Sequence, residues 1–308
     1  MTTAPLAVHR LTSSAGVVAT ISRRAAALRG LTVEGIDLIE PTTSGEPAPG
    51  LAGATLAPWP NRVEGARWDL YDAEQVLEVT EPEFGHANHG LLLETDYEVV
   101  SEQPHEIALR TVVHDRSGYP FCLEVSVRYS LDPRGVRVRH DVRNLSKAAA
   151  PFAMGAHPYL RVGEEAVETS LLRIAARTAL TIDATHIPRG TLDVAGTPWD
   201  LRAGRRVAEI VPHAAYTHLE SEAGVIVHRL TSPSGRCVEL WAEADFAWVQ
   251  VYVANDFDSD LGSTTAIAIE PMTAPPNALR TGEGLRWLEP GERWTSEWGI
   301  RLAETPHA

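Results

Sequence analysis

The sequence predicts an all-β protein built as one large antiparallel β-sandwich. Apolar and polar residues alternate in 121–144, 225–241 and 246–253, the pattern of strands with one buried face. Turn residues at 132–135 (Asp-Pro-Arg-Gly) and 232–235 (Ser-Pro-Ser-Gly) interrupt the first two runs and predict hairpins. The 23 Gly and 21 Pro favour many short strands joined by turns.

The remaining segments fit the same architecture. Apolar residues in 16–40 are broken up by glycines and predict short strands, and a Pro-, Gly-, Ser- and Thr-rich loop follows at 41–53. The span 202–215 is the most compatible with a helix, although it is short and contains Gly and Pro. No linker, low-complexity tract or strong repeat divides the chain, so we expect one domain over residues 1–308.

Composition and charge exclude several classes of partner. With 41 acidic against 27 basic residues, the formal charge of -14 repels polyanions and anionic lipid, so neither nucleic acid nor membrane is expected to bind. The N-terminus lacks a signal or transit pattern, and no apolar run approaches the roughly 20 residues of a membrane span. We therefore expect a cytoplasmic protein. Cys122 and Cys237 read as small buried side chains, without a zinc or disulfide pattern.

Glu270 stands where the sequence predicts the end of a buried strand. Residues 266–269 are small or apolar, and Pro271 cannot donate to a sheet ladder, so the strand is expected to stop here. A carboxyl group at the edge of an apolar strand loses water on one side, which raises its pKa. A raised pKa suits a general base working near neutral pH. The alternative is a solvated residue before a turn.

His157 lies in the segment PFAMGAHPYL, between small residues and Pro158. This setting predicts a ring held in a fixed orientation near a strand end. Imidazole has an ordinary pKa close to physiological pH, so it is the usual proton donor or acceptor in enzymes, although a structural role is the alternative. His140, on the apolar face of its strand, is interpreted as a hydrogen-bonded core histidine.

Asn61 and Arg62 follow a segment in which two prolines flank Trp59 and keep the backbone extended. Together their side chains offer several hydrogen-bond donors and an amide acceptor, which suits sugar hydroxyls. A surface arginine beside a turn asparagine is the alternative interpretation.

His86 and His89 are three residues apart, and Glu83 is a conceivable third ligand for a metal ion. Gly85 and Gly90 disfavour the regular helix that would align these side chains, and Gly90 instead predicts a tight turn after His89. We therefore do not expect a metal site here.

Five fragments together resemble the aldose 1-epimerase (galactose mutarotase-like) family. In chain order they are APWPNRVEG (57–65), NHG (88–90), GAHPYL (155–160), WVQVYV (248–253) and AIAIEPMTAPPNAL (266–279). Each is short, but their order and their spread over most of the chain make the resemblance fairly specific. It implies a twisted antiparallel β-supersandwich with an open cleft for a monosaccharide. It also implies no metal or organic cofactor, and a monomer or homodimer.

The resemblance further implies catalytic roles for three residues. His157 would be the general acid, Glu270 the general base, and His89 a second histidine beside the ring oxygen. The expected reaction interconverts the α and β anomers of a free aldose through ring opening to the aldehyde, with each proton transfer contributing about 100- to 10,000-fold.

Binding residues follow from the same motifs, with two departures from the family pattern. Asn61 and Arg62 would hold sugar hydroxyls, and Tyr159 and Gln250 would line the cleft. The family usually has a sugar-binding aspartate in a segment that resembles HAAYTHL (213–219), so His213 stands where that carboxylate is expected. The arginine that often follows the HG motif is replaced by Leu92 or Leu93. The preferred sugar therefore stays open.

Three other functions remain as alternatives. A hexose-phosphate mutarotase would need extra Arg or Lys for phosphate, and this acidic chain has one arginine in its Asn-Arg motif. A noncatalytic sugar-binding or sensing protein is favoured by the missing aspartate, but it would not need both His157 and Glu270. A glycoside hydrolase needs a second carboxylate near Glu270. The sequence does not place the available carboxylates there: Asp183, Asp193 and Asp200.

Overall fold

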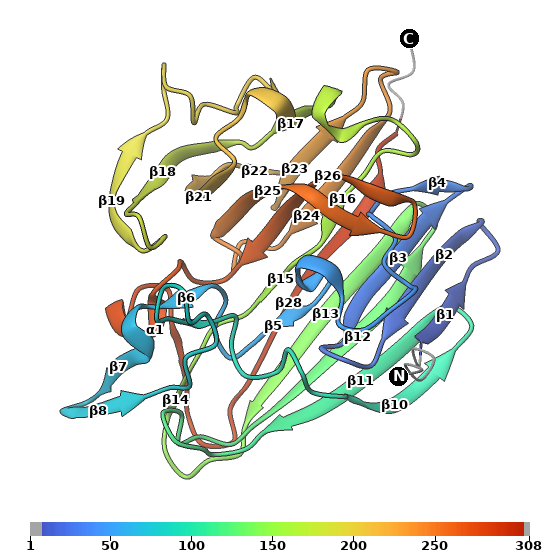
Figure 1. Cartoon of the computed structure of the whole chain (residues 1–308). Coiled ribbons are helices and arrows are strands. Elements are labelled where there is room, and N and C mark those ends of the chain that lie inside the picture. The colour runs from blue at the N-terminus through green and yellow to red at the C-terminus, as the bar shows by residue number, and fades with distance from the viewer. Residues whose placement is uncertain (1–7, 305–308) are drawn as a thin grey trace.

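The computed structural model describes residues 8–304, and strands joined by turns dominate this part of the chain (Figure 1). The largest sheet has ten strands. Its strands, in spatial order, are β10 (Glu98–Gln103), β11 (Glu106–Val113), β12 (Leu123–Asp132), β13 (Gly135–Asn144), β28 (Arg293–Leu302), β24 (Cys237–Ala242), β23 (Val225–Thr231), β17 (Leu171–Arg173) and β20 (Arg205–Arg206), with β22 (Ser221–Glu222) beside β23.

A second sheet of eight strands carries most of the motif residues. Its order is β19 (Pro188–Asp193), β18 (Ala176–Ile182), β21 (His213–Leu219), β25 (Trp248–Ser259), β26 (Gly262–Met272), β15 (Gly155–Ala156) and β5 (Thr55–Leu56), with β16 (Tyr159–Leu160) beside β26. The third sheet consists of β1 (Val8–Thr12), β2 (Val17–Ser22), β3 (Ala27–Val33) and β4 (Ile36–Asp37). Neighbouring strands in all three sheets run antiparallel.

Short elements complete the described chain. Three strand pairs lie outside the large sheets: β14 (Ala150–Phe152) with β27 (Arg286–Leu288), β6 (Arg62–Val63) with β9 (Ala87–Asn88), and β7 (Arg67–Leu70) with β8 (Ala73–Val76). The α-helix α1 spans Ala278–Thr281, and the 3-10 turns are η1 (Pro49–Leu51), η2 (Glu64–Ala66), η3 (Val167–Thr169) and η4 (Val207–Glu209). Within 8–304, no helix is long and apolar enough to cross a membrane.

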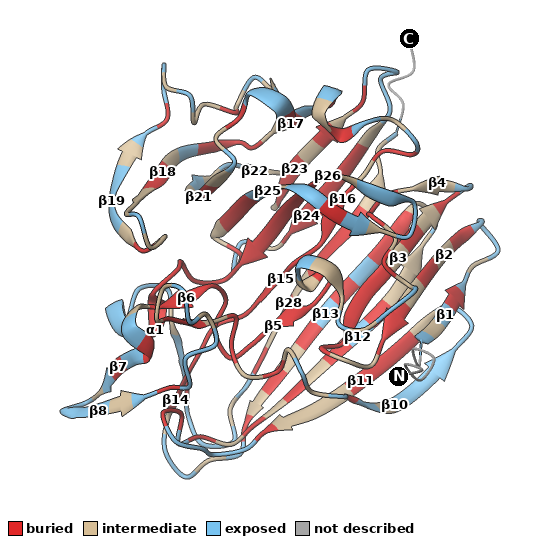
Figure 2. Cartoon of the chain, viewed as in Figure 1, coloured by how far each residue is buried: buried red, intermediate tan, exposed pale blue. Residues whose placement is uncertain are grey.

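The hydrophobic core joins the three sheets and explains the alternation in the sequence (Figure 2). Val249 and Ile269 of the eight-stranded sheet belong to the same buried cluster as Leu240 of the ten-stranded sheet and Ile21 of β2. Because side chains alternate across a strand, only one face of each amphipathic strand reaches this cluster. The all-β sandwich class is thereby confirmed.

The hairpins form where the turn residues predict them. β12 and β13 pair from Leu123 opposite Asn144 to Asp132 opposite Gly135, and β23 pairs with β24 around the second predicted turn. His140 is a core histidine, as expected: it is buried, and its Nε2 accepts a hydrogen bond from Trp298 Nε1 at 2.9 Å.

Three local expectations are wrong. The helix-compatible span 202–215 forms β20, η4 and the start of β21, because pairing with neighbouring strands outweighs weak helical propensity. The strand that carries Glu270 was expected to end there, but it continues to Met272. Pro271 is opposite Val249 of β25. On the other side of β26, β16 and β15 leave a gap in the pairing beside Pro271. Cys122 and Cys237 are half-buried free thiols rather than fully buried side chains.

Candidate active site

Glu270 and His157 meet in a buried pair although they are far apart in the sequence. Glu270 lies on β26, and His157 lies between β15 and β16, which pair with the same strand. His157 Nε2 is 3.4 Å from Glu270 Oε1, and their side chains are only 7% and 2% exposed. The backbone of His157 is fixed on its other side, because its N–H donates to the Ala54 carbonyl and its carbonyl accepts from Gly53 N–H. The pair is therefore held by three strands.

Burial favours the uncharged form of both groups. Burial raises the pKa of Glu270 to about 8, opposed by the positive charge of Arg62, and it lowers the pKa of His157 to about 4. Among the described residues, Glu270 Oε2 and His157 Nδ1 are buried without a hydrogen-bond partner. Buried polar atoms of this kind are rare in native structures, and here they give the pair unused capacity to bind a ligand.

His89 lies beside this pair, and its ring faces the His157 ring edge-on at a centroid distance of 5.5 Å. The predicted tight turn is present: His89 and Gly90 have φ angles of 59° and 82°, and a Cβ on Gly90 would clash with the Ala57 carbonyl. His89 Nδ1 accepts a hydrogen bond from the backbone N–H of Asn61 at 3.2 Å. Burial lowers the pKa of His89 well below its usual range, so the neutral ring carries its proton on Nε2.

Asn61 and Arg62 are anchored by the Glu270 motif itself. The N–H of Asn277, seven residues after Glu270, donates to the Arg62 carbonyl at 2.7 Å, and Asn277 Oδ1 accepts from Glu64 N–H at 3.0 Å. The Arg62 guanidinium makes a bidentate ion pair with Glu81, with both N–O distances at 2.6 Å. Asn61 Oδ1 accepts from the Arg62 N–H at 2.8 Å. Some of the hydrogen-bonding groups that were predicted to hold sugar hydroxyls therefore already have partners within the protein.

Tyr159 and Gln250 flank the pair. The Tyr159 ring stacks on the His157 ring with a centroid distance of 5.1 Å, and its hydroxyl donates to the Gly50 carbonyl at 3.2 Å. Gln250 on β25 is directly opposite Glu270 on β26, so both side chains lie on the same face of the sheet. Both residues are buried, as Glu270 is.

His213, at the position where the family pattern has an aspartate, begins β21 and stacks on a residue that the sequence motifs missed. The rings of His213 and His186 are 4.4 Å apart and inclined by 28°. Burial, followed by the charges of His186 and Arg62, lowers the pKa of His213 to about 3. His186 lies in the turn between β18 and β19, in a segment without any family motif. Only its place before an Ile-Pro turn could have drawn attention to it.

The potential metal ligands in the described chain are not the ones that the sequence spacing suggested. His86 Nδ1 accepts from the backbone N–H of Gly65 at 3.1 Å, and Glu83 is exposed, so neither joins His89. The group whose ligand atoms lie within 4.8 Å of one another is His89, His157 and Glu270. Two imidazoles and a carboxylate are a donor set that divalent transition metals accept.

The three aspartates considered for glycoside hydrolysis have other partners. Asp183 accepts from Arg189 and from its own turn, Asp200 pairs with Arg202, and Asp193 accepts from the N–H of Ala195. The titratable side chain in contact with Glu270 is the imidazole of His157 rather than a second carboxylate. This arrangement lacks the two facing carboxyl groups of a glycosidase.

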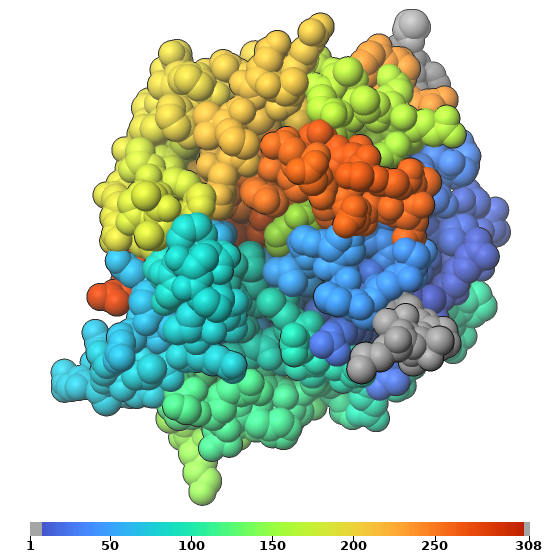
Figure 3. Space-filling model, viewed as in Figure 1, coloured from blue at the N-terminus to red at the C-terminus, as the bar shows by residue number. Residues whose placement is uncertain are grey.

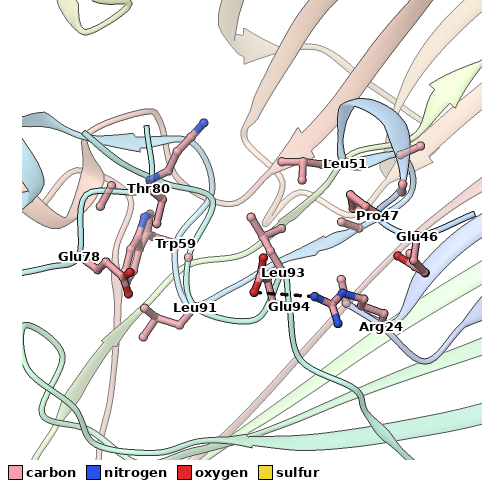
Figure 4. Close-up of a pocket in the computed structure, with 18 of the residues that line it drawn as sticks. Arg24, Glu46, Pro47, Leu51, Trp59, Glu78, Thr80, Leu91, Leu93 and Glu94 are labelled. Carbon is pink, nitrogen blue, oxygen red and sulfur yellow. Dashed lines mark hydrogen bonds and ion pairs between the residues drawn. The ribbon is translucent and has the colours of Figure 1, made fainter. Parts of the chain in front are cut away.

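The face of the molecule in Figure 3 is hollowed at its centre, where blue and cyan segments from the first third of the chain meet the orange hairpin of β25 and β26. Figure 4 shows a pocket, which has a volume of about 480 Å³. Ala52 and Ala54 belong to its lining, and the Ala54 carbonyl accepts the backbone N–H of His157. Neither His157 nor Glu270 lines this pocket. Its lining combines the side chains of Trp59, Leu51 and Leu93 with an Arg24–Glu94 ion pair at 3.8 Å.

Comparisons with known proteins agree with this architecture. The uncharacterized protein YihR of Escherichia coli K12 is 29% identical over 276 residues, 89% of this chain and 86% of that protein. A GalM/aldose epimerase homologue from C. elegans has a TM-score of 0.85 at 17% identity, covering 97% of this chain and 99% of its own. A galactose mutarotase-like protein from Clostridium acetobutylicum has a TM-score of 0.82 at 15% identity, covering 98% and 99%. The sequence model for aldose 1-epimerase matches residues 7–301. The chain belongs to the aldose 1-epimerase family.

Proposed function

We propose that the protein is a mutarotase that interconverts the α and β anomers of an aldose, with His157 as general acid and Glu270 as general base. The observation that carries the proposal is the buried His157–Glu270 contact of 3.4 Å, in which each group keeps one unpartnered polar atom. Mutarotation needs one proton removed and one delivered at two oxygens that are bonded to the same carbon. An acid and a base side by side suit this requirement.

The shared proton of the pair supplies both roles. Carboxylic acid with imidazole, and carboxylate with imidazolium, contain the same number of protons. Burial favours the uncharged arrangement in the free protein. An anomeric hydroxyl that donates to Glu270 would favour the carboxylate, because hydrogen bonds to a charged form stabilise it. Substrate binding would therefore move the proton to His157.

Ring opening then balances without a cofactor. Glu270 takes the proton of the C1 hydroxyl, the C1–O5 bond breaks as the aldehyde forms, and O5 receives the proton of the His157 imidazolium. Rotation about C1–C2 presents the other face of the aldehyde. On ring closure O5–H returns its proton to His157 as O5 attacks C1, and Glu270 gives its proton to O1, which yields the opposite anomer and restores the starting protonation of the pair. The Nε2–H of His89 would donate to the developing charge on the sugar oxygen.

Polarimetry tests this function directly. Pure α-anomers of glucose, galactose, arabinose and xylose, dissolved with and without protein, are expected to approach equilibrium faster with protein for at least one sugar. Saturable sugar binding measured by calorimetry, without any acceleration, would instead support a noncatalytic sugar-binding protein.

A further inference from the structure

The loop of residues 41–53 ends against His157. Gly53 N–H donates to the His157 carbonyl at 2.9 Å. Earlier in the loop, the Gly50 carbonyl accepts from the Tyr159 hydroxyl at 3.2 Å, and the Tyr159 ring stacks on the His157 ring. The loop therefore contacts His157 directly through its backbone and indirectly through Tyr159, so the place of the imidazole depends on the place of the loop.

Polar contacts, rather than the hydrophobic core, hold the first half of this loop. None of residues 43–51 is fully buried. The carboxylate of Asp260 accepts from the backbone N–H and the hydroxyl of Thr43, both at 2.6 Å, and from the same two groups of Ser44, whose N–H is at 3.1 Å. The Asp260 N–H donates to the Pro41 carbonyl at 2.8 Å. Hydrogen bonds to a carboxylate are roughly twice as strong as those between neutral groups, so Asp260 is a firm anchor for the loop.

Arg29 of β3 is a second anchor of the same part of the loop. Its guanidinium is 1% exposed and donates to Thr42 Oγ1 at 3.0 Å, to the Gly45 carbonyl at 2.7 Å and to Glu46 Oε1 at 2.8 Å. Breaking a buried ion pair by removing one partner destabilises a whole protein, so replacing Arg29 would not separate positioning from folding. Asp260 is exposed, and its replacement leaves no buried charge behind. It is therefore the anchor that can be tested.

Asp260 also belongs to the hairpin that carries Glu270. It lies in the turn between β25 and β26, and Glu270 lies on β26. In Figure 3 the blue loop lies against the orange tip of this hairpin. Phe257 of β25 adds a second contact, because its ring centroid is 4.4 Å from that of Tyr159. One hairpin thus holds Glu270 by the chain itself, and holds His157 through the loop and Tyr159.

We propose that Asp260 is a positioning residue, which fixes the 41–53 loop on the hairpin and thereby keeps the His157 imidazole in place against Glu270. The inference rests on the proposed mutarotase function and adds to it a residue that does not touch the pair. Misplacing a reacting group by about 1 Å can cost roughly 100-fold in rate, so a loosened loop should lower kcat. Asn61 and Arg62, the residues proposed to hold the sugar, are fixed by contacts outside the loop, so KM should change little.

Three substitutions in the hairpin test the anchor itself. Asp260→Ala removes all of the side-chain acceptors. Asp260→Asn keeps one acceptor oxygen and should recover part of the lost rate. Asp258→Ala is the matched control, because it removes an exposed carboxyl from the same hairpin, two positions before the anchor.

A pair of glycine substitutions tests the link from the loop to His157 without changing any charge. Gly50 has a φ of 54°, and an added Cβ would lie 2.5 Å from the Tyr159 hydroxyl, so Gly50→Ala should push the loop and Tyr159 apart. Gly45→Ala is its control, because a Cβ there meets nothing within 4 Å in the part of the chain that the structure describes. The Gly45 carbonyl that accepts from Arg29 is kept.

Polarimetry on a sugar that the wild type converts gives kcat and KM, with folding checked by circular dichroism. We expect Asp260→Ala and Gly50→Ala to lower kcat by about 10- to 100-fold, with KM within about twofold of the wild type and Asp260→Asn in between. Asp258→Ala and Gly45→Ala should keep the wild-type kcat. An unchanged kcat in both Asp260→Ala and Gly50→Ala, or an equal loss in the two controls, would overturn the proposal. Should Asp260→Ala not fold, Asp260→Asn and Gly50→Ala still decide it.

A second readout separates this inference from the mutarotase function. In protein with 13C-labelled histidine, the His157 ring resonance is assigned by its absence in His157→Asn. We expect it to shift in Asp260→Ala and in Gly50→Ala, and to stay in place in the two controls. If no sugar responds to the wild type, the proposed function fails while this shift still supports the positioning role. A His157 resonance that is unchanged in Asp260→Ala and in Gly50→Ala would overturn the positioning role whatever the activity.

Discussion

The Nδ1 atom of His89 accepts a hydrogen bond from the backbone N–H of Asn61 at 3.2 Å, which fixes the proton of the neutral ring on Nε2. The same contact ties two sequence motifs, Asn-Arg and Asn-His-Gly, to the His157–Glu270 pair, because the His89 ring lies 5.5 Å from that of His157. His89 is therefore placed as a hydrogen-bond donor rather than as a second acid.

Removing that donor should slow the chemistry without unfolding the protein. His89→Leu is expected to lower kcat about 100-fold, the typical effect of losing one donor to a developing oxyanion. His89→Gln, which keeps a side-chain donor, should recover part of the rate. Polarimetry measures both, and His9→Asn serves as a control on a histidine of the peripheral strand β1. A His89→Leu enzyme with unchanged kcat would rule out this role.

The activity should depend on pH through the buried pair. Burial holds the pKa of Glu270 at about 8 and that of His157 at about 4, so between these values the pair keeps its one shared proton. We expect kcat/KM, which reports the free enzyme, to be flat from about pH 5 to 7 and to fall below about pH 4 and above about pH 8. A profile with a single rise near the ordinary pKa of histidine would contradict this assignment.

Stability should also respond to Glu270. Its pKa is raised to about 8 in the folded state against 4.5 as its ordinary value, so the folded protein keeps a proton that the unfolded chain loses. The wild type should therefore lose stability between about pH 4.5 and 8 relative to Glu270→Gln, by up to about 1.4 kcal/mol per pH unit. Urea unfolding at several pH values measures the difference, with Glu283→Gln, an exposed carboxyl, as control. A pH-independent difference would show that Glu270 titrates alike in both states.

Chelation should leave the reaction intact. The proposed steps move protons between His157, Glu270 and the sugar, and none uses a metal ion. Treatment with EDTA followed by dialysis is therefore expected to preserve kcat. Added Zn²⁺ should inhibit competitively with sugar, because His89, His157 and Glu270 offer ligand atoms within 4.8 Å of one another. Activity that disappears on chelation and returns with a metal would require a different mechanism.

Local patterns predicted the strands and hairpins well, because strand periodicity and turn residues act over a few positions. The Asp-Pro-Arg-Gly turn set the register of β12 and β13 over their whole length. The end of β26 was not predicted correctly from the sequence. Pro271 is tolerated within this strand because β15 and β16 leave a gap in the pairing beside it. That gap depends on segments more than a hundred residues away.

The candidate site was likewise predicted only in part: motifs identified residues, but the sequence did not reveal their contacts. Glu270 and His157 were identified by motif, but their 3.4 Å contact depends on β15, β16 and β26 pairing across the chain. His186 carried no motif, and only its ring contact with His213 reveals it. The ion pair of Arg62 with Glu81 was equally invisible, since nothing in the order of residues links the two side chains.

A double-mutant cycle on His157 and Glu270 tests most directly that the two residues act as one proton-transfer unit. kcat is measured by polarimetry for wild type, His157→Asn, Glu270→Gln and the double variant, with folding checked by circular dichroism. We expect each single variant to lose about 100- to 10,000-fold, and the double variant to lose hardly more than the worse single one. Losses that multiply in the double variant, or a single variant that keeps wild-type activity, would contradict the account.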